Sequence, residues 1–282
     1  MKNLSKPALR WVIFLICLAA MLGIFPISTP PPTQAQSPLP DKFLFQWGAQ
    51  AGQGEFNWPS GIAVGPDGTV YVAEEDNHRV QRFSPTGAFL GSWGRLGSGD
   101  GQFWYPWGVA VAPDGSVYVS DTRNHRIQHF SATGAFLSKW GFEGTLATGG
   151  FGYVVGIAVA PDGTVYVADA GNGFVHRFTS AGEPLASFGT SGGIVAGIAI
   201  SKGGVVYVTK GDSGEVLMFS ESGVRLGGWE SGIWSYGIAV AKDDTVYVTD
   251  GGHARVQRFT PDGTPIGAWG SYGPGDGQFG SS

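Results

Sequence analysis

Cysteine is nearly absent from this chain of 282 residues, and the one cysteine, Cys17, lies in an apolar N-terminal stretch. The rest of the chain can therefore hold no disulfide bond and no cysteine chemistry. Charged residues are also scarce, at 14% of the sequence, which excludes a disordered or coiled-coil protein. The chain instead contains 48 glycines and 13% aromatic residues, which favours many short strands joined by tight turns.

The chain has a single long apolar run, residues 11–25, which reads WVIFLICLAAMLGIF and follows three basic residues. This is the pattern of a secretory signal, and the run is short for a bilayer span. We therefore predict a signal peptide over residues 1–35, followed by a Pro-rich spacer over residues 36–42. An uncleaved anchor through residues 11–25 is the alternative. Either way the protein is expected outside the cytoplasm, secreted or tethered to a membrane.

The charge of the chain disfavours nucleic acid as a partner. The formal net charge is −5, from 17 basic and 22 acidic residues. Residues 1–35 carry three basic residues and no acids, so their removal leaves a net charge of about −8. Proteins that bind nucleic acid gain most of their affinity by neutralising phosphates, which an acidic chain does poorly.

Five copies of one pattern follow one another along the chain. The first reads GIAVGPDGTVYVAEEDNHRVQRFSPTGAFLGSWG and is followed at intervals of 40 to 48 residues by four variants of itself. The copies begin at Gly61, Gly108, Gly156, Gly197 and Gly237. A period of this length, found before any other feature, is typical of propellers and solenoids.

Each copy predicts four short strands. GIAV leads through a Pro-Asp-Gly turn into TVYVA, and RVQRF leads through a Thr-Gly or Asp-Gly turn into AFLGSWG. Four antiparallel strands in about forty residues form one blade of a β-propeller, and each blade buries its faces against its neighbours. We expect the Trp or Phe that ends each fourth strand to lie between blades. The predicted blades span residues 57–94, 104–141, 152–189, 193–230 and 233–270.

The shared GIAV, PDG and VYV segments, with DNHRVQRF at residues 76–83 and RNHRIQHF at 123–130, resemble the NHL repeat family. The likeness covers residues 43–282 and implies an all-β propeller, usually with six blades. Residues 43–48, FLFQWG, match a lone fourth strand, and the end of the chain matches a linker before a first strand. We therefore expect five complete four-stranded blades plus an incomplete sixth, in a chain that stops inside its sixth repeat. A five-bladed or open ring, or a partner chain over the gap, is the alternative.

A row of charged residues follows the second strands, and each has a possible partner five residues on. The pairs are Glu74 with Arg79, Asp121 with Arg126, Lys210 with Glu215, and Asp250 with Arg255. A ring of carboxylates could hold a metal, but in the fourth copy both charges are inverted together. A contacting ion pair permits that exchange and a metal ring does not, so we predict structural ion pairs. The third copy keeps its acid, Asp169, but has Phe174 in place of the basic partner.

No catalytic residue, metal site or cofactor is predicted. The first strands, which line the channel of a propeller, carry no His, Asp or Glu in any copy. Propeller enzymes that resemble this chain, such as the peptidyl-hydroxyglycine lyase and the gluconolactonase-like hydrolases, hold a metal in that channel. A metal-dependent lyase or lactonase remains the alternative function, because linkers or a sixth blade could supply ligands.

Aromatic residues crowd the linkers that precede the first strands. They are Trp58, Trp104, Tyr105, Trp107, Tyr153, Trp234 and Tyr236. In a propeller these linkers share a face with the turns after the second strands, so the rings should gather around one mouth of the channel. Such rings stack on sugars or hold peptide side chains. We predict a non-catalytic binding or scaffold module for protein, peptide or glycan ligands. The alternative is that these rings are ordinary core between blades.

Overall fold

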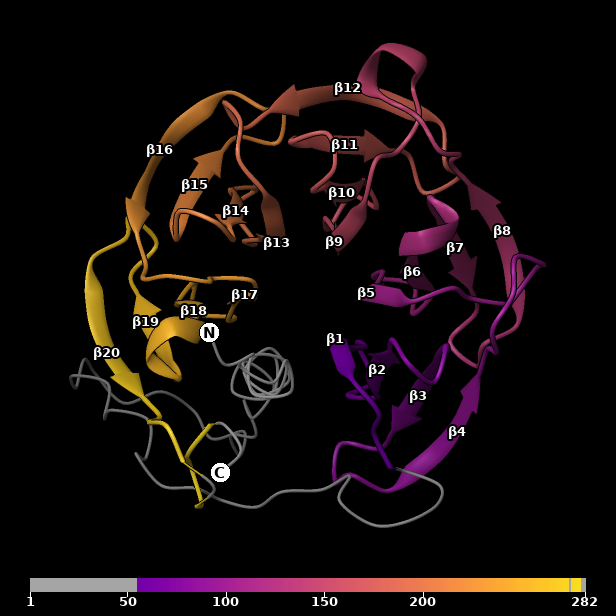
Figure 1. Cartoon of the computed structure of the whole chain (residues 1–282), viewed down its shortest axis with the longest axis horizontal. Helices are drawn as coiled ribbons and strands as arrows, with labels where there is room; N and C mark the ends of the chain where they lie inside the picture. Colours follow the sequence, from indigo (N-terminus) through magenta and orange to yellow (C-terminus); the bar gives the residue numbers. More distant parts are fainter. Residues whose placement is uncertain (1–54, 274, 280–282) are drawn as a thin grey trace, which may run out of the picture.

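In the computed structural model, residues 55–273 and 275–279 are described, and they form five antiparallel sheets of four strands each. The sheets are arranged as blades around a common centre, with the first strand of each blade innermost and the fourth outermost (Figure 1). The prediction of an all-β propeller with four-stranded blades is confirmed for these five blades.

The strands follow the repeat closely. The first blade contains β1 (Pro59–Val64), β2 (Val70–Glu74), β3 (Arg79–Phe83) and β4 (Phe89–Trp93). The second contains β5 (Pro106–Val111), β6 (Val117–Asp121), β7 (Arg126–Phe130) and β8 (Phe136–Trp140). The third contains β9 (Val154–Val159), β10 (Val165–Asp169), β11 (Phe174–Phe178) and β12 (Pro184–Gly189). The fourth contains β13 (Val195–Ile200), β14 (Val206–Lys210), β15 (Glu215–Phe219) and β16 (Arg225–Glu230). The fifth contains β17 (Ile238–Val240), β18 (Val246–Asp250), β19 (Arg255–Phe259) and β20 (Pro265–Trp269). Three short 3-10 helices, η1 (Thr122–Asn124), η2 (Leu146–Thr148) and η3 (Gly251–His253), lie in turns and linkers.

The Pro-Asp-Gly turns join the first two strands of a blade for a local reason. In the first blade, Asp67 accepts hydrogen bonds from the backbone N–H and the hydroxyl of Thr69, at 2.9 and 2.8 Å. Gly68 has φ +84°, a left-handed conformation that costs glycine little. The strand that follows, β2, is buried along its whole length.

Blades are joined by the aromatic residue near the end of the fourth strand, as the repeat predicts. Trp93 of β4 packs against Phe130 of the second blade, with ring centroids 5.7 Å apart. Equivalent contacts join Trp140 to Phe178, Phe188 to Phe219, and Trp229 to Phe259. The tyrosine of each second strand adds a hydrogen bond to the next blade, from the hydroxyls of Tyr71, Tyr118, Tyr166 and Tyr207 to backbone carbonyls. The inter-blade role predicted for the fourth-strand aromatics is confirmed at these four interfaces.

A glycine in the first strand of each of the first four blades is required by close packing between first strands. A Cβ on Gly61 would overlap the carbonyl oxygen of Trp107 in the next blade. Gly108, Gly156 and Gly197 face the next first strand in the same way. The backbones of neighbouring first strands therefore approach each other closely.

The described blades do not close the ring by themselves. Each first strand contacts the next, from β1 through β17, but no comparable contact joins β17 to β1 among the described residues. The sixth blade therefore remains a prediction, and its proposed strand at residues 43–48 lies outside the described residues. The predicted signal peptide, spacer and membrane anchor lie outside them as well. Within the described ranges, no helix is long and apolar enough to cross a membrane.

Candidate functional site

The linkers are fastened to the turns after the second strands, so both lie on one face of the propeller. In each blade a backbone N–H of that turn donates to a linker carbonyl, at 2.9 to 3.1 Å. The donor and acceptor pairs are Glu75 to Trp58, Arg123 to Trp104, Ala170 to Tyr153, Gly211 to Ile194, and Gly252 to Ile233. We call this surface the linker face.

A buried carboxylate organises the linker face of the second blade. Asp121 is fully buried and accepts a hydrogen bond from the Trp104 backbone N–H at 2.7 Å. Its oxygens also accept from the side chains of Asn124, Arg126 and Gln128, at 2.9, 2.7 and 3.0 Å. We call this arrangement the carboxylate cluster. It ties the linker, the turn and the third strand to one acid.

The first and fifth blades repeat much of this cluster. Glu74 accepts from Arg79 Nε at 2.5 Å, from the Asn77 side chain at 2.7 Å and from the Asn57 backbone N–H at 2.8 Å. In the fifth blade, Asp250 accepts from Arg255 Nε at 2.8 Å and lies 2.9 Å from His253 Nδ1. Both carboxylates are fully buried. The carboxylates of these blades are thus engaged in holding the fold.

The third blade replaces the missing arginine with a histidine. His176 Nε2 lies 3.2 Å from Asp169, which also accepts from the backbone N–H groups of Gly152 and Tyr153. Burial alone would raise the pKa of Asp169. These hydrogen bonds and that from Asn172 outweigh burial and lower its pKa from 3.8 to about 2. Sequence reasoning missed this role of His176, although it occupies the strand position of Gln128 in the second blade.

The fourth blade has an ion pair but no cluster. Lys210 Nζ lies 3.6 Å from Glu215, which also contacts Arg225 at 3.1 Å. With this pair, all four acid–base pairs predicted from the sequence are in contact in the structure. In the described part of the chain, no group of three His, Cys, Asp or Glu side chains is placed to hold a metal ion.

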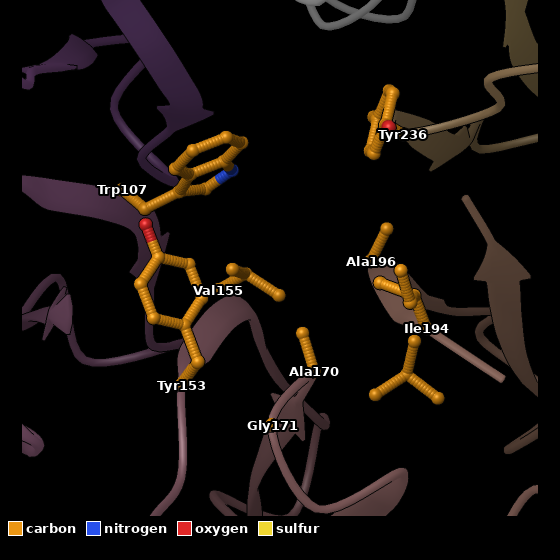
Figure 2. A pocket seen from close by; sticks show the side chains of 9 residues that line it. Trp107, Tyr153, Val155, Ala170, Gly171, Ile194, Ala196 and Tyr236 are labelled. Carbon is orange, nitrogen blue, oxygen red and sulfur yellow. The ribbon is translucent and has the colours of Figure 1, made fainter. Parts of the chain in front are cut away.

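Three of the seven predicted aromatic residues meet at one pocket of about 320 Å³. Trp107 and Tyr153 lie on one side of it, and Tyr236 and Ile194 lie on the other (Figure 2). Val155 and Ala196 line it further. These side chains come from the linkers and first strands of four successive blades, so the pocket lies at the mouth of the channel on the linker face.

Small residues in two turns leave room for this pocket. Ala170 and Gly171 line it where the second blade has Thr122 and Arg123. A Cβ on Gly211, in the fourth blade, would strike the ring of Tyr236. Sequence reasoning did not select these small residues or Ile194. The sequence carries no distinct signal for them, since the same turn also reads Gly251-Gly252 in the fifth copy.

The other four aromatic residues lie outside the pocket. Trp104 and Trp234 are 46% and 47% exposed, whereas Trp58 and Tyr105 are half-buried. Tyr105 packs edge-on against His78, with ring centroids 5.0 Å apart. None of the seven aromatic residues is fully buried.

Comparisons with known proteins agree with this architecture. The sequence model described as "NHL repeat" matches residues 56–83, 103–130, 151–178 and 237–259. The sequence has no significant match among curated proteins.

Several solved structures share the fold. A nidogen/laminin complex matches with a TM-score of 0.65 and 15% identity, over 80% of this chain and 84% of that chain. A virginiamycin B lyase from Staphylococcus aureus matches with a TM-score of 0.59 and 15% identity, over 74% and 68% of the two chains. A streptogramin B lyase matches with a TM-score of 0.61 and 16% identity, over 79% and 72%. At these identities the likeness extends to the fold alone.

Proposed function

The chain belongs to the NHL repeat family, and we propose that it is a non-catalytic binding module of the extracytoplasmic space. Its ligand, a protein, peptide or glycan, inserts an apolar group into the pocket at the channel mouth. The surrounding linker face, with exposed Trp104 and Trp234, provides further contact area.

One observation carries the proposal: linkers and first strands from four blades place apolar side chains around a single cavity. A volume of about 320 Å³ is at the small end for ligand pockets and suits one ring or one side chain. Aromatic rings that are partly exposed around a concave site are typical of binding surfaces. The carboxylates nearby are buried in the clusters, which leaves the pocket wall mainly apolar.

The fold itself is compatible with both binding and catalysis, since its structural neighbours include a nidogen/laminin complex and streptogramin lyases. The site favours binding, because a metal-dependent lyase or lactonase needs converging ligands that the described residues do not provide. Metal analysis of the purified protein separates the two functions. Stoichiometric zinc, magnesium or calcium would contradict our proposal.

The first test is a peptide and glycan array screen with the purified protein and three variants. Tyr236→Ala removes a ring of the pocket, whereas Trp234→Ala removes an exposed ring of the same linker. Leu137→Ala, on the outer strand β8, is the matched control. We expect Tyr236→Ala to weaken binding by about tenfold, Trp234→Ala to weaken it less, and Leu137→Ala to leave it unchanged. Undiminished binding by Tyr236→Ala would contradict the proposed site.

A further inference from the structure

We infer that the pocket selects ligands in which an apolar or aromatic group adjoins an anionic group, and that Arg123 recognises the anion. This inference rests on the proposed function and adds a ligand class to it. It depends on the position of one cation against Tyr153, a residue that lines an otherwise apolar cavity.

Arg123 lies beside one of the rings that line the pocket. Its guanidinium carbon is 5.6 Å from the centre of the Tyr153 ring, and Tyr153 lines the pocket. A guanidinium at this distance interacts favourably with the face of the ring, which holds it next to Tyr153. Its donors can also form two parallel hydrogen bonds to a carboxylate or phosphate.

The backbone around Arg123 is anchored to the linker face. Arg123 N–H donates to the Trp104 carbonyl at 3.1 Å. The hydroxyl of Thr122 donates to the Val154 carbonyl, one residue beyond Tyr153, at 2.8 Å. Helix η1 is therefore attached to the linker of the second blade and to the start of β9 in the third, which fixes the backbone from which the Arg123 side chain extends.

Arg123 differs from the other arginines on this face because its charge is available. Arg79, Arg126 and Arg255 each bind a buried carboxylate. Within the described part of the chain, Arg123 forms no salt bridge, and its side chain is exposed. An anionic ligand could thus reach its guanidinium without breaking an existing ion pair.

The other turns explain why an anion would be oriented toward the second blade. At the position of Arg123 the remaining copies carry Asp76, Gly171, Asp212 and Gly252. Asp212 belongs to the fourth blade, which contributes Ile194 to the pocket. We expect a carboxylate on the ligand to turn toward Arg123 rather than toward the blade that carries Asp212.

Three small probes of nearly equal shape test this inference on the purified full chain: phenylacetate, benzyl alcohol and benzylamine. Isothermal titration calorimetry or ligand-observed NMR gives their dissociation constants. We expect phenylacetate to bind about fivefold more tightly than benzyl alcohol, as a partly exposed ion pair allows, and benzylamine to bind most weakly. The preference should decrease with added salt, because the pair is accessible to solvent.

Two charge-matched variants identify the residue responsible. Arg123→Gln should abolish the preference for phenylacetate while retaining the binding of benzyl alcohol. Lys202→Gln changes the net charge equally but lies in the turn between β13 and β14, away from the linker face, and should retain the preference. Equal binding of the three probes to the unmodified protein, or loss of the preference in both variants, would overturn the inference. Failure of all three to bind would count against the proposed pocket itself.

Discussion

The second and fourth blades have the same four-stranded sheet but hold their linkers differently. In the second, Asp121 accepts hydrogen bonds from the linker, the turn and the third strand. In the fourth, Lys210 stands in its place and can accept none, so the linker keeps the backbone bond found in every blade, here from Gly211 N–H to the Ile194 carbonyl, without a buried acid. The repeat therefore tolerates loss of the buried acid. The linker of the fourth blade contributes Ile194 to the pocket.

The largest expected effect of this difference is on stability. Asp121→Ala leaves the buried Arg126 guanidinium and several N–H donors unpaired, which should cost about 3 to 5 kcal/mol. Lys210→Ala removes a longer ion pair and leaves Glu215 with Arg225, so its cost should be about 1 kcal/mol or less. Chemical denaturation of the two variants measures both values. Equal losses would show that the acid has no special structural role.

The third blade extends the comparison because its acid, Asp169, has a histidine partner and a lowered pKa. The pKa of Asp169 is lowered to about 2 in the folded protein, against 3.8 as its ordinary value. The stabilisation from this group, about 2 kcal/mol, is therefore complete above pH 4 and is lost as the pH falls through 2. Denaturation curves recorded between pH 5 and pH 2 should show this dependence.

Asp169→Asn provides the control for the acid titration. The variant should be less stable at pH 5, and the stability difference from the unmodified protein should shrink as the pH falls toward 2. Other acids, such as Asp114 with its lowered pKa, titrate in both proteins and cancel in the difference. A difference that stays constant over this range would contradict the assigned pKa.

Much of the fold could be predicted from the sequence, because each blade is specified by local patterns. The GIAV and VYV segments predict strands, and Asp67 and Gly68 specify a turn within a few residues of each other. The joint charge inversion at Lys210 and Glu215 also predicted contact, since the two residues face each other across adjacent strands.

The pocket was harder to predict because its residues come from different blades. The sequence placed Trp107, Tyr153 and Tyr236 on the correct face, but it could not separate them from Trp104 and Trp234. Which way a linker side chain points depends on the length and dihedral angles of each linker, and these vary between copies. Small residues such as Gly171 contribute by leaving space, which has no signal of its own in one sequence.

Backbone conformation gives the smallest expected difference between the second and fourth blades. Tyr105, in the second linker, has φ +55°, whereas Ile194, at the same place in the fourth, is not in the left-handed region. Only glycine adopts that region at little cost, so Tyr105→Gly should be more stable than Tyr105→Ala by about 0.5 to 1 kcal/mol. At Ile194 the order should reverse, because glycine there only adds freedom to the unfolded chain. Thermal unfolding of the four variants measures both differences, and the same order at both sites would mean that the two linkers share one conformation.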